Sequence, residues 1–147
     1  MSLQFKSIGE FAKVKGGKRL PKGEDVIDEP SGFPYIRVTD MGVNGIEQSQ
    51  VKFISQAVQE KIKRYTISVD DVYISIAGTN GRVGIVPYSL NNANLTENAA
   101  KITNIDSSYN PKFLMYFLRS YLGQSQILAK TGGTSQPKLA LNRIEEI

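Results

Sequence analysis

Residues 69–87 have the sequence VDDVYISIAGTNGRVGIVP, and this stretch decides the fold. Aliphatic side chains at positions 72, 74 and 76 alternate with Tyr73 and Ser75, which is the two-residue period of a half-buried strand. Glycines at 78 and 81 then interrupt the pattern, and a largely β-branched run follows at 83–86. Glycine supplies the positive φ angle that a tight turn requires. The stretch therefore predicts a β-hairpin.

Three polar side chains, Thr79, Asn80 and Arg82, lie at the tip of this predicted hairpin. Hydroxyl, amide and guanidinium groups can read the hydrogen-bond pattern of bases, since arginine matches guanine and asparagine matches adenine. A phosphate-binding loop would have to open into a helix, whereas this chain continues as a β run. We interpret the tip either as a base-reading loop or as an ordinary solvated turn.

The composition limits the chemistry that the chain can perform. Its 147 residues, 40% hydrophobic and 22% charged, fit one globular domain. The sequence has no cysteine and no histidine, so disulfides, thiolate sites and the commonest general base are excluded. It also has no signal peptide and no apolar run long enough to cross a bilayer, which makes a cytoplasmic location the expectation.

Positive charge is concentrated in the first 22 residues, which hold six lysines and arginines against one acid, Glu10. The net charge is +4 with a pI near 9.3, which favours an anionic partner. Residues 15–22, KGGKRLPK, predict a basic loop whose glycines free backbone amides for phosphate contact. Residues 130–138 repeat the GG, three residues, PK spacing. Thr134, Ser135 and Gln136 lie inside that second loop, and glutamine can pair with adenine.

The remaining patterns predict a single α+β domain with a mixed, curved β-sheet and helices packed on one side. Residues 34–41 predict a strand that turns Ile36 and Val38 to the core. Ser55 is the expected N-cap of a helix that runs to about Tyr65, and Asn110 caps a second helix. The second helix carries an apolar stripe that we expect to be core, formed by Phe113, Leu114, Phe117, Leu118 and Tyr121.

Several separated stretches resemble the target recognition domain of the specificity subunit (HsdS) of type I restriction–modification systems. They are PYIRVTDM at 34–41, DDVYISIAGTNGRVGIV at 70–86, NNANLTENAAKI at 91–102 and GGTSQPKLALNRIEEI at 132–147. Each stretch is short, but their order and spacing agree over nearly the whole chain. The resemblance implies that residues 1–147 form one DNA target recognition domain, ending before the family's spacer helix.

The resemblance also implies a non-catalytic role in sequence-specific DNA binding. Double-stranded DNA, modification and restriction subunits, and a second recognition domain or a dimer partner are then the expected partners. Adenine methylation and cleavage, with S-adenosylmethionine, ATP and Mg²⁺, would belong to the partner subunits, so no cofactor is expected on this chain.

Polar side chains are expected to read the bases of DNA, and cationic side chains are expected to contact its phosphates. Base reading falls to the two loop tips, with Thr79, Asn80 and Arg82 on one and residues 134–136 on the other. Phosphate contacts would position the protein and make binding salt-dependent. They are expected from Lys15, Lys18, Arg19, Lys22, Arg37, Lys130 and Lys138.

Two other functional classes remain open from the residues alone. A small Mg²⁺-dependent nuclease would need carboxylates that converge on one ion, for which Asp40, Asp70 and Asp71 are the candidates. A protein-interaction module would instead use the basic loops to dock on a larger assembly.

Overall fold

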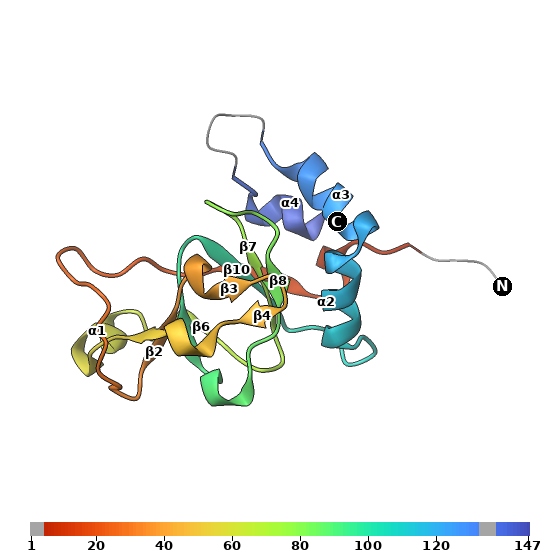
Figure 1. The fold of residues 1–147 in the computed structure, drawn as a ribbon. Coiled ribbons are helices and arrows are strands. Elements are labelled where there is room, and N and C mark those ends of the chain that lie inside the picture. The colour runs from red at the N-terminus through yellow and green to blue at the C-terminus, as the bar shows by residue number, and fades with distance from the viewer. Residues whose placement is uncertain (1–4, 133–137) are drawn as a thin grey trace.

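Strand β7 (Val72–Ser75) lies at the centre of a three-layered arrangement (Figure 1). The computed structural model describes residues 5–132 and 138–147. A first, fully antiparallel sheet has the order β1 (Lys13–Gly16), β10 (Ala99–Thr103), β7 and β8 (Val83–Gly84). The predicted hairpin is confirmed, because β7 pairs with β8 and places Ile74 opposite Val83.

A second four-stranded sheet packs against the first. Its order is β5 (Lys52–Phe53), β2 (Pro34–Ile36), β9 (Ala93–Leu95) and β6 (Thr66–Ile67), and the β2–β9 pair is parallel. Strands β3 (Met41–Gly42) and β4 (Gly45–Ile46) form a separate two-stranded hairpin. The α+β class with mixed strand directions is confirmed, and the strands are divided between sheets instead of forming one curved sheet.

The helices are short and mostly gather on one face of the first sheet. The α-helices are α1 (Gln56–Lys61), α2 (Pro111–Arg119), α3 (Tyr121–Lys130) and α4 (Leu141–Glu145). Four 3₁₀ turns complete the described elements: η1 (Ile8–Glu10), η2 (Val38–Asp40), η3 (Gln48–Gln50) and η4 (Tyr88–Leu90). Helices α2, α3 and α4 cover the first sheet, whereas α1 lies at the far end of the molecule (Figure 1). No helix among the described residues is long and apolar enough to cross a membrane.

Both predicted helix caps are confirmed. The Ser55 hydroxyl accepts a hydrogen bond from the amide of Val58 at 3.2 Å, and the Asn110 carboxamide accepts one from Lys112 at 2.8 Å. Helix α1 nevertheless ends at Lys61 instead of near Tyr65, because the backbone leaves the helical region at Ile62 (φ −124°, ψ 24°). Caps are local features, so the sequence predicts them well.

Strand β7 is buried on both faces, which corrects the prediction of a half-buried strand. Ile74 packs in the core beneath the helices, and Tyr73 packs in the core between the two sheets. Both side chains have an exposed fraction of 0%. The period of two is real, but each face meets another layer, so neither is solvated.

The apolar stripe on the second predicted helix is only partly core. Leu114 and Leu118 are buried, whereas Phe113 is 71% exposed and Tyr121 is 85% exposed. The chain changes direction at Ser120, which has extended backbone angles, ends α2 and caps α3. A single helical face therefore does not continue from residue 113 to residue 121.

The outer face of α2 borders an open apolar groove of about 690 Å³ beside the N-terminal segment. Its lining includes Phe5, Phe11, Phe113, Phe117 and Ile147. Helix α2, which contributes to this groove, lies at the opposite end of the molecule from α1 (Figure 1).

Candidate nucleic-acid interface

The hairpin tip is held in one conformation by backbone and hydroxyl contacts at its base. The Ser75 amide donates to the Arg82 carbonyl at 2.9 Å, and the Arg82 amide donates to the Ser75 hydroxyl at 2.8 Å. The Gly81 amide donates to the Ser75 carbonyl at 2.9 Å. Gly78 and Gly81 have φ angles of 80° and 82°, as predicted for a turn that needs left-handed residues. The tip is therefore a preformed loop.

The three predicted base-reading residues of this tip have different exposures. Thr79 is exposed, and Asn80 and Arg82 are half-buried. The guanidinium of Arg82 lies near Tyr73. Burial raises the pKa of the Tyr73 hydroxyl, and the positive charges of Arg119 and Arg82 oppose that rise.

Side chains of α2 and α3 are hydrogen-bonded to the backbone of the hairpin. The Gln124 side chain donates to the Gly81 carbonyl at 3.1 Å and to the Leu118 carbonyl at 2.7 Å. The Arg119 guanidinium donates to the Val83 carbonyl at 2.7 Å. These three bonds tie the turn and the strand that follows it to the helical layer. The hairpin and the helices consequently form one rigid support for the tip.

The second predicted reading loop begins and ends beside the first. Thr134, Ser135 and Gln136 themselves lie outside the described residues. On either side of them, the Gly132 amide donates to the Lys138 carbonyl at 3.4 Å. The Leu139 amide donates to the Ile76 carbonyl at 3.0 Å, which joins this segment to the hairpin.

The two lysines of this region differ in their surroundings. Lys138 is exposed. Lys130 forms an ion pair with Glu146 at 3.1 Å, so part of its charge is matched within the chain.

The first basic segment is a strand followed by a close backbone crossing, which corrects the expectation of a loop with free amides. Lys15 lies within β1, opposite Lys101. The Gly17 amide donates to the Ala99 carbonyl at 3.1 Å, and the Lys18 amide donates to the Leu95 carbonyl at 2.9 Å. A Cβ atom at Gly17 would lie 2.0 Å from the Thr96 carbonyl oxygen. The chain needs glycine at 17 for close packing, and these amides are not free for phosphate.

The side chains of this segment nevertheless face solvent. Lys15, Lys18, Arg19 and Lys22 are all exposed. The Lys18 ammonium lies 5.6 Å from the centre of the Tyr65 ring, within reach of a cation–π contact.

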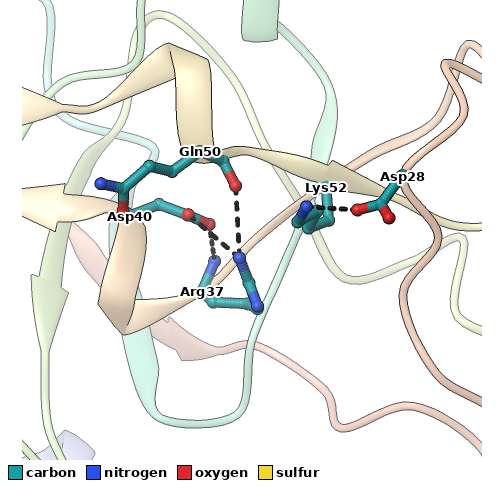
Figure 2. A network of polar contacts seen from close by, with 5 residues as sticks. All are labelled: Asp28, Arg37, Asp40, Gln50 and Lys52. Carbon is teal, nitrogen blue, oxygen red and sulfur yellow. Dashed lines mark hydrogen bonds and ion pairs between the residues drawn. The ribbon is translucent and has the colours of Figure 1, made fainter.

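Arg37 is held in a polar network that the sequence did not predict (Figure 2). Its guanidinium donates to the Asp40 carboxylate at 3.4 Å and to the Gln50 carbonyl at 3.2 Å. The Asp40 carboxylate also accepts a hydrogen bond from the Arg37 amide at 2.9 Å. This cap starts η2, so the predicted strand over 34–41 ends at Ile36. Arg37 thus has a structural role whether or not it also contacts DNA.

The second ion pair in the same view joins Lys52 of β5 to Asp28 (Figure 2). A hydrogen bond from the Lys52 ammonium, together with its positive charge, lowers the pKa of Asp28. The pair links the loop before β2 to the edge of the second sheet, where the Ile27 amide also donates to the Phe53 carbonyl at 2.7 Å.

Three segments far apart in the sequence enclose an open polar hollow of about 360 Å³. We call it the Arg19–Arg37 hollow. The segments are residues 19–26, 35–39 and 96–98. Its charged and polar lining includes Arg19, Asp25, Tyr35, Arg37, Glu97 and Asn98. The Asn98 carbonyl accepts hydrogen bonds from the amides of Ile76 (2.9 Å) and Ala77 (3.3 Å), so the hollow adjoins the base of the hairpin tip.

Two of the three candidate acids of a nuclease serve as local caps. Asp40 is fully buried and binds Arg37, and the buried carboxylate of Asp71 accepts a hydrogen bond from the Ser68 amide at 2.9 Å. Within residues 5–132 and 138–147, no three acidic side chains gather in a way that could hold a metal ion. The geometry therefore gives no support to a carboxylate metal site in this part of the chain.

The chain shares its fold with known specificity subunits. The S subunit of the type I restriction–modification system from M. genitalium superposes with a TM-score of 0.65 and 18% identity, over 100% of this chain and 35% of that one. The HsdS subunit from Thermoanaerobacter tengcongensis superposes with a TM-score of 0.66 and 18% identity, over 98% of this chain and 36% of that one.

Sequence comparison reaches the same group. The specificity subunit of the type I restriction enzyme EcoBI from Escherichia coli is 26% identical over 123 residues, which are 84% of this chain and 25% of that protein. The family model for the type I restriction modification DNA specificity domain matches residues 2–147. The chain belongs to this family. It spans about a quarter of the EcoBI subunit and about a third of each solved subunit.

The sequence alone did not place residues 96–98 in a hollow with Arg19 and Arg37. Residues 96–98 lie between β9 and β10, and NNANLTENAAKI reads only as a turn followed by a strand. A polar TEN triplet between two apolar segments was the available signal, but its proximity to Arg19 and Arg37 depends on the tertiary fold.

Proposed function

We propose that this chain is a target recognition domain that binds double-stranded DNA in a sequence-specific manner. The observation that carries the proposal is that the hydrogen-bonded hairpin tip lies next to the Arg19–Arg37 hollow. The chain also belongs to the DNA specificity domain family. A preformed tip with polar side chains suits base reading, and the neighbouring cations suit phosphate contact.

In this proposal the chain performs no chemistry and carries no cofactor. Modification and restriction subunits, with S-adenosylmethionine, ATP and Mg²⁺, would methylate and cleave the DNA that the chain selects. A second recognition domain or a second copy of the chain would read the other part of the target. The exposed apolar side chains of Phe5, Phe113 and Leu128 are a surface feature compatible with such protein contacts.

The test is binding to a labelled duplex of mixed sequence at several salt concentrations. Each neutralised phosphate adds about 0.9 to the slope of log affinity against log salt. We expect Lys22→Ala to lower that slope by about 1 without changing the preferred sequence. Lys112→Ala removes an equal charge from the start of α2, at the opposite end of the molecule, and should leave the slope unchanged.

Absence of binding at low salt, both for the chain alone and with a modification subunit added, would contradict the proposal. Binding that appears only with the modification subunit would support recognition within the assembly. Copurification of a protein partner without any DNA binding would favour the interaction module instead.

A further inference from the structure

Glu97 is an anionic side chain close to the cations Arg19 and Arg37, and Asp25 is a second anionic side chain in the same lining. Glu97 lines the Arg19–Arg37 hollow and is half-buried. Its Oε2 atom accepts a hydrogen bond from the adjacent Thr96 hydroxyl at 3.2 Å. Among the described residues, Oε1 has no hydrogen-bond partner, and neither Arg19 nor Arg37 pairs with the carboxylate.

The local fold fixes where this carboxylate stands. The Thr96 amide donates to the Ile36 carbonyl at 3.0 Å, which ties the segment to β2. On the other side, the Asn98 carbonyl binds the amides that lead into the hairpin tip. Glu97 therefore stands between the second sheet and the predicted reading loop. The neighbouring Tyr35 hydroxyl donates to the Lys18 carbonyl at 2.8 Å, which joins the Lys18–Arg19 segment to the same hollow.

The charge of Glu97 is unfavourable near DNA unless it meets a hydrogen-bond donor. Phosphates repel a carboxylate, and the bases present exocyclic amino groups as donors in the major groove. At cytosine that donor is N4, and it is the group with which glutamate or aspartate pairs in direct readout. Arg19 in the same hollow partly offsets the repulsion between the carboxylate and the DNA backbone, whereas Arg37 is already paired with Asp40.

We propose that Glu97 is a specificity-determining residue that accepts a hydrogen bond from the N4 amino group of a cytosine in the major groove. The inference rests on the proposed function, because it assigns one base contact to that DNA interface. It extends the interface from the two loop tips to the connection between β9 and β10.

The experiment compares the unaltered chain with Glu97→Gln in a selection from randomised duplexes, followed by affinity measurements on the selected target. If a modification subunit is needed for binding, it is present in every arm. We expect the unaltered chain to select cytosine at one position. Glutamine keeps one acceptor oxygen but pairs best with adenine, so Glu97→Gln should shift the preference from cytosine towards adenine. It should bind the selected target more weakly, by up to roughly 5- to 150-fold, the range for one good base contact. Affinity for unrelated duplexes should not fall, since one repulsive charge has been removed.

Glu60→Gln is the matched control. Glu60 lies on α1, its side chain is 62% exposed, and the substitution removes the same charge outside the hollow. It should keep the cytosine preference. A second readout replaces the selected cytosine by 2-pyrimidinone, which lacks the N4 amino group. That replacement should weaken binding of the unaltered chain and of Glu60→Gln, and should weaken binding of Glu97→Gln less, because the carboxylate is the stronger acceptor.

The outcomes separate this inference from the function on which it rests. Equal strengthening of Glu97→Gln on all duplexes, with the same selected sequence, would overturn the role of Glu97 and leave DNA recognition intact. Full binding of the unaltered chain to the 2-pyrimidinone duplex would overturn it independently of how the variant folds. Failure of the unaltered chain to prefer any sequence would overturn the proposed function, and this inference with it.

Discussion

Asp40 illustrates how a single residue can suggest chemistry while serving structure. Its side chain is fully buried, accepts a hydrogen bond from the Arg37 amide and pairs with the Arg37 guanidinium. Together these contacts start η2 and hold Arg37 beside the hollow. A buried carboxylate with both of these partners is explained without a metal ion.

We expect Asp40→Ala to lower the free energy of unfolding by about 1–3 kcal/mol, because the Arg37 amide loses its acceptor. Urea denaturation monitored by circular dichroism measures this change. Asp70→Ala, at an exposed position, should change stability by about 0.5 kcal/mol or less. If the Asp40 variant were as stable as the unaltered chain, the capping role would be wrong.

Helix α2 shows that the sequence predicts an element more reliably than the direction of its faces. The pattern NPKF correctly locates the start of the helix, because the cap and the first-turn proline act within a few residues. The stripe alone does not determine which members reach the sheet. Leu118 is fully buried and Phe113 is largely exposed. At 3.6 residues per turn, two residues five positions apart point about 140° away from each other around the helix.

Substitutions on α2 test the difference in burial between Leu118 and Phe113. Leu118→Ala should cost about 2–5 kcal/mol, because it opens a cavity in the core beneath the helices. Phe113→Ala should cost about 0.5 kcal/mol or less, because the side chain is already 71% exposed. Equal losses in chemical denaturation would mean that α2 packs in another orientation.

At the scale of the whole molecule, β7 is buried on one face by the helical layer and on the other by the second sheet. The Arg19–Arg37 hollow and the apolar groove beside α2 are two separate surfaces of this layered structure. Helix α1 lies toward one end of the molecule, and α2 lies at the other (Figure 1). The apolar groove is lined partly by α2, whereas the hollow is lined by residues 19–26, 35–39 and 96–98. Tyr73 is buried in the core between the two sheets, and Tyr35 is buried beside the hollow in a cluster with Val58 of α1. Burial is the main cause that raises the pKa of both hydroxyls above 10.0.

These tyrosines predict a loss of stability at alkaline pH. Below their ordinary pKa, folded and unfolded chains both hold the phenol protons, so this contribution is fully present. As the pH rises above 10.0, the unfolded chain loses these protons first, and the free energy of unfolding falls until the folded chain also ionises. Urea denaturation at about pH 8 and about pH 11 should show the fall.

Tyr73→Phe should make that alkaline loss smaller, whereas Tyr88→Phe, at a side chain that is 84% exposed, should not. An unchanged pH dependence in Tyr73→Phe would show that ionisation of Tyr73 does not limit the stability of the fold.

Local patterns therefore allowed prediction of the hairpin, two helix caps and the α+β class, all of which depend on neighbouring residues. The layering of β7, the crossing at Gly17 and the hollow depend on contacts between segments far apart in the sequence. Gly17 shows the difference clearly, because its sequence context resembles a phosphate loop while its position requires close approach to the Thr96 carbonyl. The assignment of individual side chains to DNA contacts stays a prediction.

The hydrogen bonds from the Leu139 amide to the Ile76 carbonyl and from the Gln124 side chain to the Gly81 carbonyl have a consequence for how specificity can change. Loop tips that share anchors do not vary independently, so substitutions at one tip should have effects that depend on the residues present at the other. Libraries that vary the residues of one tip alone would then contain few variants that still bind DNA specifically. Joint diversification of residues 79–82 and 134–136, with Gln124 included as an anchor, matches the way in which the chain is built.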